Sequence, residues 1–146
     1  MTTVPLDALV ALDPSVAAQG ADIAPLQSDI VRFSAADLSE AQNKYARLKA
    51  DHPDSRVFVD LDVHIASDAR TARRDVLASE TKPRDGVLQY VGTASGLAGL
   101  IADIVAVDVA DGVILRPIVD RSADDVVRSI DADVVPALAI RRVRAS

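Results

Sequence analysis

The sequence predicts an α/β fold built on a mainly parallel sheet. Short apolar segments of strand length alternate with segments in which apolar residues recur every three to four positions, the spacing of amphipathic helices. Apolar residues make up 49% of the chain, which is enough to bury a core, and an aromatic content of 3% makes that core aliphatic. At 146 residues we expect a single domain, residues 1–146.

Two strands are predicted within the first 33 residues. Residues 6–12 are almost continuously apolar and predict a short buried strand. Asp13 and Pro14 predict the start of a helix, with the aspartate as N-cap and the proline at the first helical position, and Gly20 predicts its end. Residues 28–33 predict the second strand.

The third and longest strand is predicted after a helix. Ser34 is expected to cap a helix over residues 35–49, and residues 51–55 are expected to form a turn. Residues 56–66 then predict a strand, because apolar side chains fill alternate positions. These side chains are Val57, Val59, Leu61, Val63 and Ile65.

The second half of the chain predicts one more strand. Residues 68–79 predict a helix, and residues 80–86 predict a polar loop. Thr93 or Ser95 is expected to cap a further helix that ends near Val107. Residues 112–116 predict the fourth strand, and the remainder predicts two short helices and a basic tail. Four strands leave two open edges, which invite pairing with another chain.

Asp60, Asp62 and His64 fill the other alternate positions of the longest strand, so their side chains share one face. Two carboxylates and an imidazole in this arrangement could bind a divalent cation or share a proton. Alternatively, they form the solvated face of an edge strand. We favour this second interpretation because the sequence shows no companion ligands from another loop. His52, beside Pro53 in a turn, is expected to be exposed.

Anion binding is a second candidate function. In parallel α/β folds, helix N-termini at the carboxyl ends of strands present free N–H groups to phosphates. Asp13-Pro14-Ser15 and Gly92-Thr93-Ala94-Ser95-Gly96 are expected at such positions, although we favour plain helix caps for both. Arg116, at the end of the fourth strand, either contacts an anionic ligand or neutralises nearby aspartates.

Composition excludes several functional classes. The formal net charge of −6 and the few aromatic residues argue against nucleic acid and anionic membrane surfaces as partners. Cysteine is absent, which excludes disulfides, thiolate metal sites and cysteine nucleophiles. The sequence shows no signal peptide and no apolar run of membrane-spanning length, so we expect a cytoplasmic protein.

Three segments near the C-terminus resemble, in order, the end of luciferase-like flavin-dependent monooxygenases. They are similar to that family's "VGT" helix start, "DGF-x-L-x-P" strand and "VVPEL" helix. Here they read Val91-Gly92-Thr93, Asp111-Gly112-Val113-Ile114-Leu115-Arg116-Pro117 and Asp133-Val134-Val135-Pro136-Ala137-Leu138. Residues 21–33 resemble the family's "AD-x-V-x-V" strand, and residues 54–72 resemble its next strand and helix. The resemblance covers nearly the whole chain but only the C-terminal half of the family's barrel.

The resemblance implies a half TIM-type β/α barrel with about four mainly parallel strands and flanking helices. It implies FMN or a deazaflavin as cofactor and a small organic molecule as substrate. The flavin phosphate would lie near Ser15, Thr93 and Ser95, with Arg116 as charge partner. The sequence departs from the family at the glycine-rich phosphate segment, where only Ser15 is retained.

Three hypotheses of function follow. In the first, the chain is a flavin-dependent oxidoreductase that completes its barrel as a homo-oligomer or with a partner subunit. In the second, it is a non-catalytic remnant of that family that acts as a binding or assembly module. In the third, it is a metal-dependent hydrolase that uses Asp60, Asp62 and His64. No residue is assigned as catalytic.

Overall fold

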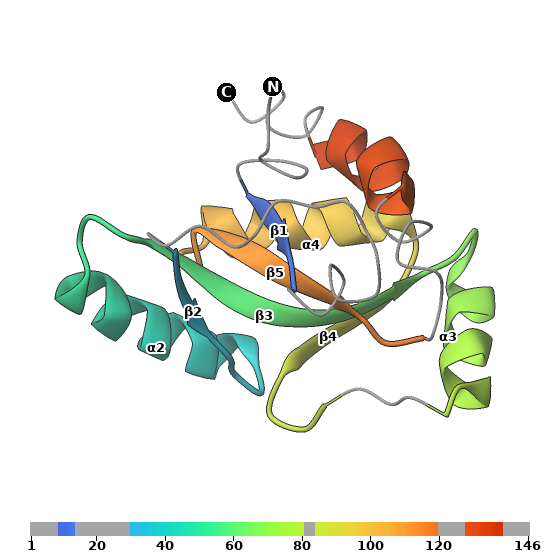
Figure 1. Cartoon of the computed structure of the whole chain (residues 1–146), viewed down its shortest axis with the longest axis horizontal. Coiled ribbons are helices and arrows are strands. Elements are labelled where there is room, and N and C mark those ends of the chain that lie inside the picture. The colour runs from blue at the N-terminus through green and yellow to red at the C-terminus, as the bar shows by residue number, and fades with distance from the viewer. Residues whose placement is uncertain (1–8, 14–29, 81–83, 120–127, 139–146) are drawn as a thin grey trace.

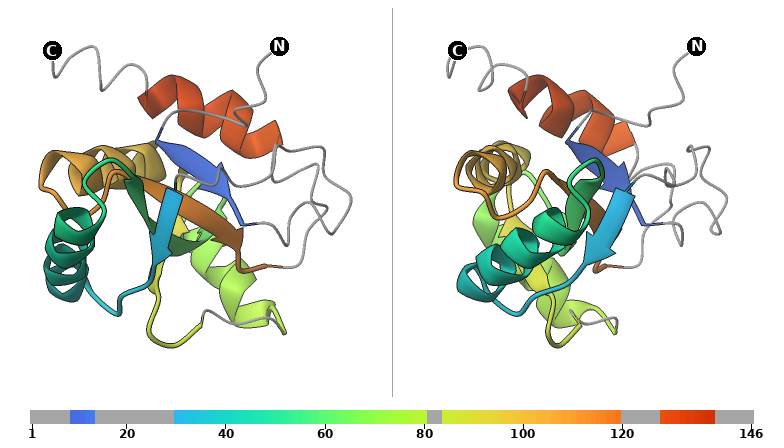
Figure 2. Two further views of the ribbon diagram at one scale, coloured as in Figure 1. Left: turned by 60° about the vertical axis from the view of Figure 1, so that its left-hand side comes forward. Right: turned by 90° about the vertical axis from the view of Figure 1, so that its left-hand side faces the viewer.

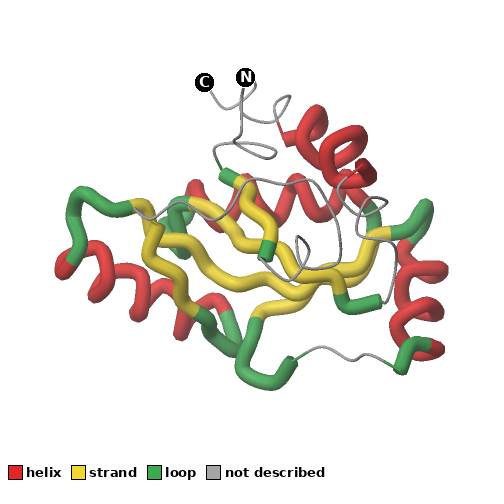
Figure 3. Tube along the Cα trace, viewed as in Figure 1, coloured by secondary structure: helices red, strands yellow, loops and turns green. Residues whose placement is uncertain are grey.

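The computed structural model describes residues 9–13, 30–80, 84–119 and 128–138, and within them five strands form one parallel sheet (Figures 1 and 3). The predicted α/β class with a mainly parallel sheet is confirmed. The predicted helix after Asp13 and the basic tail lie outside the described residues. The strands are β1 (Val10–Leu12), β2 (Ile30–Phe33), β3 (Arg56–Ile65), β4 (Leu88–Gly92) and β5 (Gly112–Pro117).

Strand β3 lies at the centre of the sheet. β5 pairs with it over residues 58–63, and β1 extends the sheet beyond β5. The opposite edge of β3 is shared, because β2 pairs with residues 56–59 and β4 with residues 61–65. The prediction of four strands was therefore one short. The expectation that β3 is an edge strand was wrong, since both of its edges are hydrogen-bonded.

In the part of the chain that the structure describes, three α-helices follow strands, and each begins at a side-chain cap. They are α2 (Leu38–Asp51), α3 (Ala69–Ala78) and α4 (Ala94–Ala106). Asp68 and Thr93 cap α3 and α4, whereas α2 is capped by Asp37 and not by the predicted Ser34. The Asp37 carboxylate accepts from the Glu40 N–H, and the Glu40 carboxylate accepts from the Ala36 N–H. This reciprocal pair resembles a capping box, which outcompetes a lone serine.

The core lies between one face of the sheet and the helices. The alternating apolar residues of β3 are buried on this face together with Val113 and Leu115 of β5. Helix α4 covers them with Leu97, Ile101 and Ile104, and α2 adds Ala41, Tyr45 and Leu48. The helical segment 128–138, which contains the π-helix η1 (Ile130–Val134), completes the cluster (Figure 2). The alternation predicted for β3 is confirmed.

The sheet curls like part of a barrel. In a flat sheet of order β1-β5-β3-β2, the outer strands β1 and β2 would lie about 14 Å apart, three strand spacings. Yet the Arg32 guanidinium on β2 contacts Asp13, the residue after β1, as well as Asp60 on β3. One side chain can contact both only if the sheet curves toward it, and Figure 2 shows β1 and β2 approaching each other.

Candidate functional site

The inner, concave face of the sheet carries charged side chains beside a small apolar cluster of Ala11, Phe58 and Ile114. Asp60 and Asp62 project from the middle of β3 onto this face and are 8% and 0% exposed. Arg32 on β2 pairs with Asp60 and Asp13, and Arg84 and Arg116 both pair with Asp62. Three carboxylates thus balance three guanidinium groups, and this balance permits charged groups to be buried.

Asp62 is the most completely paired of these acids. Arg116 donates to it from Nε and Nη2 at 3.1 and 2.9 Å, and Arg84 donates from Nη2 at 2.7 Å and from its backbone N–H at 3.0 Å. Burial alone would raise the pKa of Asp62, but these hydrogen bonds outweigh it and lower the pKa below the ordinary value. For Asp60 the balance is reversed, and burial raises its pKa.

This network bears on two predictions. The solvated-face interpretation of Asp60, Asp62 and His64 was wrong, because all three are buried beneath partners. The metal interpretation finds no support either: among the described residues, no group of three His, Cys, Asp or Glu side chains is placed to hold a metal ion. Arg116 neutralises an aspartate, one of the two roles considered for it.

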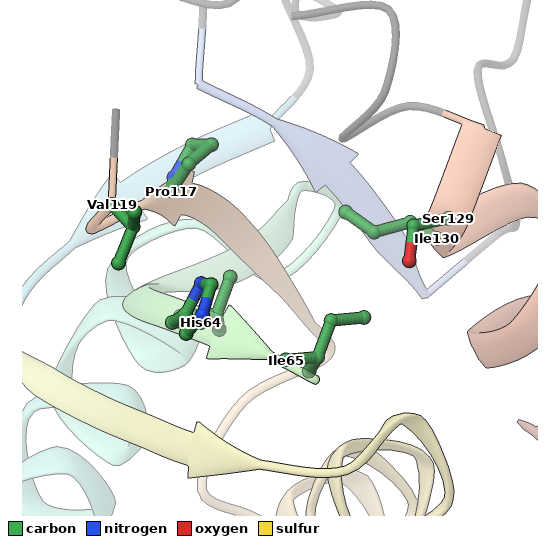
Figure 4. A pocket seen from close by; sticks show the side chains of 7 residues that line it. His64, Ile65, Pro117, Val119, Ser129 and Ile130 are labelled. Carbon is green, nitrogen blue, oxygen red and sulfur yellow. The ribbon is translucent and has the colours of Figure 1, made fainter. Parts of the chain in front are cut away.

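A pocket of about 510 Å³ opens at the carboxyl ends of β3, β4 and β5. Its polar lining includes His64, Ser67, Asp75, Ser129 and Asp133, and its apolar lining includes Ile65, Ala94 and Val119. A smaller cavity of about 20 Å³ adjoins it at His64, Ile65, Val119 and Ser129 (Figure 4). Active sites of β/α barrels lie at this end of the strands, so this pocket is the candidate site.

The glycine-rich segment that begins α4 is organised by Tyr90 of β4. The Tyr90 hydroxyl donates to the Thr93 carbonyl and accepts from the Thr93 N–H, at 3.0 and 3.1 Å. A Cβ atom at Gly92 or Gly96 would lie 2.5 or 2.0 Å from this hydroxyl. Both glycines are therefore explained by the close approach of a tyrosine, with no need for a bound phosphate.

The predicted phosphate-binding residues lie in different situations. The Thr93 hydroxyl accepts from the Gly96 N–H as the helix cap, as favoured above. Ser95 is exposed in the first turn of α4, which carries no acidic residue. Ala94 lines the pocket, and among the described residues nothing hydrogen-bonds to the N–H groups of Ala94 and Ser95. Ser15 lies outside the described residues.

Three participants in the site were missed by the sequence analysis. Arg32 occupies an inward position of β2, and an arginine on a buried strand face signals a counter-charge nearby. Arg84 and Asp75 gave no such signal, because Arg84 lies in the connection between α3 and β4 and Asp75 lies in the polar sequence of α3. Only the folded chain brings them to Asp62 and His64.

Comparisons with known proteins support the fold. No protein-family model matches the chain, and no curated protein matches it. Among solved structures, it is similar to a long-chain alkane monooxygenase, LadA, with a TM-score of 0.60 and 12% identity over 80% of this chain. It is also similar to an EDTA monooxygenase, EmoA, from Chelativorans sp. BNC1, with a TM-score of 0.59 and 12% identity over 79% of this chain. The chain spans 37% and 42% of the lengths of these two proteins.

Proposed function

We propose that this chain belongs to the luciferase-like flavin-dependent monooxygenases and contributes the flavin phosphate end of an oxidoreductase that acts on a small organic molecule. One observation carries the proposal: the motifs that resemble this family run in order along a chain whose fold is similar to parts of two monooxygenases. The pocket lies at the end of the strands where barrel enzymes bind their ligands.

The residues at the start of α4 fit a phosphate. The Ala94 and Ser95 N–H groups and the exposed Ser95 hydroxyl are donors at the positive end of a 13-residue helix, beside the pocket. Arg116 could turn toward an anion without leaving Asp62 unpaired, because Arg84 also holds that carboxylate. A bound flavin would supply the redox chemistry, while the chain supplies binding and orientation.

Whether the cofactor is FMN or a deazaflavin, its phosphate would meet the same donors. Because the chain spans about two-fifths of the two monooxygenases, we further propose that a second copy or a partner subunit supplies the rest of the barrel. The substrate would then lie between the pocket described here and the surface of the other subunit.

The test is a titration of the purified protein with FMN, followed by the visible absorption and fluorescence of the flavin. We expect saturable binding at micromolar FMN and weaker binding of riboflavin, which lacks the phosphate. Absence of binding up to millimolar FMN, and of a deazaflavin in the same assay, would contradict the proposal. That result would favour the non-catalytic binding or assembly module.

A charge variant tests whether the FMN phosphate binds at the start of α4. Ser95→Asp places a carboxylate in the first turn of α4, where it favours the helix but repels a phosphate. We expect FMN affinity to fall by about tenfold, corresponding to ~1.4 kcal/mol. Ser39→Asp makes the same change at an exposed serine in the first turn of α2 and should leave affinity unchanged. Equal effects of both variants would show that the phosphate does not bind at α4.

A further inference from the structure

His64 and Asp75 form a pair on the wall of the candidate pocket. The His64 side chain, at the carboxyl end of β3, is 5% exposed, and its Nε2 lies 2.8 Å from Oδ2 of Asp75 on α3. Both residues line the pocket, and Figure 4 shows the His64 ring among the side chains that line the small adjoining cavity. The pair therefore faces a cavity and not the packed core.

The contact with Asp75 determines which ring nitrogen carries the proton. An ionised carboxylate only accepts hydrogen bonds, so a neutral His64 must hold its proton on Nε2 and donate it to Asp75. The second nitrogen, Nδ1, then carries a lone pair. Nδ1 has no hydrogen-bond partner among the described residues, whereas every buried side-chain nitrogen or oxygen of those residues has one. Nδ1 is therefore accessible from the pocket.

We propose that the His64–Asp75 pair is a proton-accepting site for a small organic molecule that carries a hydroxyl group. His64 Nδ1 accepts the hydrogen bond from the ligand O–H. In a proton-transfer step the O–H bond breaks and an Nδ1–H bond forms. The ligand becomes an oxyanion that is hydrogen-bonded to the imidazolium, and the Asp75 carboxylate stabilises the positive charge. Asp75 is a positioning residue, because it acts through the ring of His64.

The charged groups around this pair are consistent with such a role. Asp60 and Asp62, which precede His64 on the same face of β3, are held by Arg32, Arg84 and Arg116, so they do not compete for the His64 ring. Asp133, from the helical segment 128–138, lines the same pocket and is exposed. Ile65, Ala94 and Val119 supply the apolar lining that an organic molecule needs. The proposal does not depend on flavin binding.

The first test uses the wild-type chain, whose two histidines provide an internal control. Diethyl pyrocarbonate modifies unprotonated, accessible imidazole nitrogens, and mass spectrometry assigns the product to each residue. We expect His52, which is exposed, to react first and His64 to react more slowly but measurably while the protein stays folded. Nitrogen NMR of the ring should show the Nε2–H tautomer. A His64 that stays unmodified, or a neutral ring protonated on Nδ1, would overturn the proposal.

The second test measures ligand preference with phenol and toluene, which have similar sizes but differ in the hydroxyl group. Loss of one hydrogen bond predicts that His64→Phe weakens phenol binding about fivefold and leaves toluene binding within about twofold. His52→Phe is the matched control and should change neither affinity. An equal loss of affinity for phenol and toluene in His64→Phe would show that His64 has only a structural role.

The outcomes distinguish this proposal from the flavin proposal. Asp75→Asn, which keeps the shape of the side chain, should reduce phenol binding and slow modification of His64 without preventing FMN binding at α4. Failure of FMN to bind while His64 reacts would overturn only the flavin proposal. An unreactive His64 in a protein that binds FMN would overturn only the present one.

Discussion

Asp62 is the most deeply buried of the three carboxylates in the inner network. Its carboxylate is fully buried and receives two arginine side chains from different strands or loops, Arg84 before β4 and Arg116 on β5. Such a group stabilises the fold only while it stays paired, because an unpaired buried charge costs more free energy than a lost surface contact. Through Asp62 the network therefore ties β5 and the segment before β4 to β3.

Asp62→Asn tests this role. The substitution keeps the side-chain shape but leaves Arg84 and Arg116 without a counter-charge, so we expect the free energy of unfolding to fall by about 3 kcal/mol. Urea denaturation measures the loss. Asp54→Asn, the same change at an exposed turn residue, should stay within about 0.5 kcal/mol of the wild type. A similar small effect of both variants would show that the inner network does not stabilise the fold.

The pKa of Asp62 also predicts how the stability difference between the wild type and Asp62→Asn changes with pH. The pKa of Asp62 lies below its ordinary value of 3.8 in the folded chain. Its stabilising contribution is therefore complete above pH 3.8 and is lost as the pH falls through the lower, folded pKa. The stability difference between wild type and Asp62→Asn should stay constant near neutral pH and shrink below pH 3.8. A difference that grows on acidification would contradict this assignment.

At the scale of elements, the junction between β4 and α4 depends on one hydroxyl group. Tyr90 bonds to the backbone of Thr93 in both directions, and the glycines at positions 92 and 96 leave room for its ring. Ala is favoured over Gly inside helices by about 1 kcal/mol. The glycine at position 96 is therefore explained by tertiary packing and not by helix propensity.

Gly96→Ala should destabilise the chain despite the better helix propensity of alanine. The new methyl would overlap the Tyr90 hydroxyl, and displacing it would cost two hydrogen bonds, about 1–2 kcal/mol net. In a Tyr90→Phe background the hydroxyl is gone, so the same substitution should cost much less. Thermal denaturation of the wild type, Gly96→Ala, Tyr90→Phe and the double variant measures the coupling between the two substitutions. Additive effects of the two changes would show that the overlap does not determine the stability of this junction.

The elements with strong local signals were predictable. The alternation in β3 predicted its length and its core-facing side, and Thr93, one of the two caps considered for α4, was correct because it lies directly before an apolar helical pattern. β4 was missed because Gln89 and Tyr90 lie at its middle, without a run of β-branched residues. The position of β3 could not be predicted, since pairing depends on contacts distant in sequence.

The candidate site was predictable only in part for the same reason. Alternation placed Asp60, Asp62 and His64 on one face, and the structure agrees. Their partners Arg32, Arg84 and Asp75 lie 28, 22 and 11 positions away, so no local spacing identifies them. Without these partners the same three residues suggested a metal site or a solvated face, whereas the folded chain pairs the carboxylates with arginines and the imidazole with an aspartate.

At the scale of the whole molecule, the curled sheet leaves its outer strands as edges. β1, β2 and β4 each pair with a single neighbour among the described residues, and a second chain could hydrogen-bond to their other sides. β4 is the longest of the three, and its Gln89 side chain is exposed. Pairing at these edges would extend the sheet of a chain that spans about two-fifths of the similar monooxygenases.

We predict that the chain self-associates through the β4 edge, and sedimentation equilibrium over a range of concentrations measures this. The wild type should show a reversible mass above 15.4 kDa that rises with concentration. Gln89→Lys places a charge on the edge and should shift the equilibrium toward the monomer, because an edge lysine disfavours strand pairing.

Asn43→Lys makes the same change of charge at an exposed position of α2 and should leave the equilibrium unchanged. A monomer of 15.4 kDa at high concentration would contradict self-association. Equal effects of the two lysine variants would point to net charge, and not to the β4 edge, as the cause of dissociation.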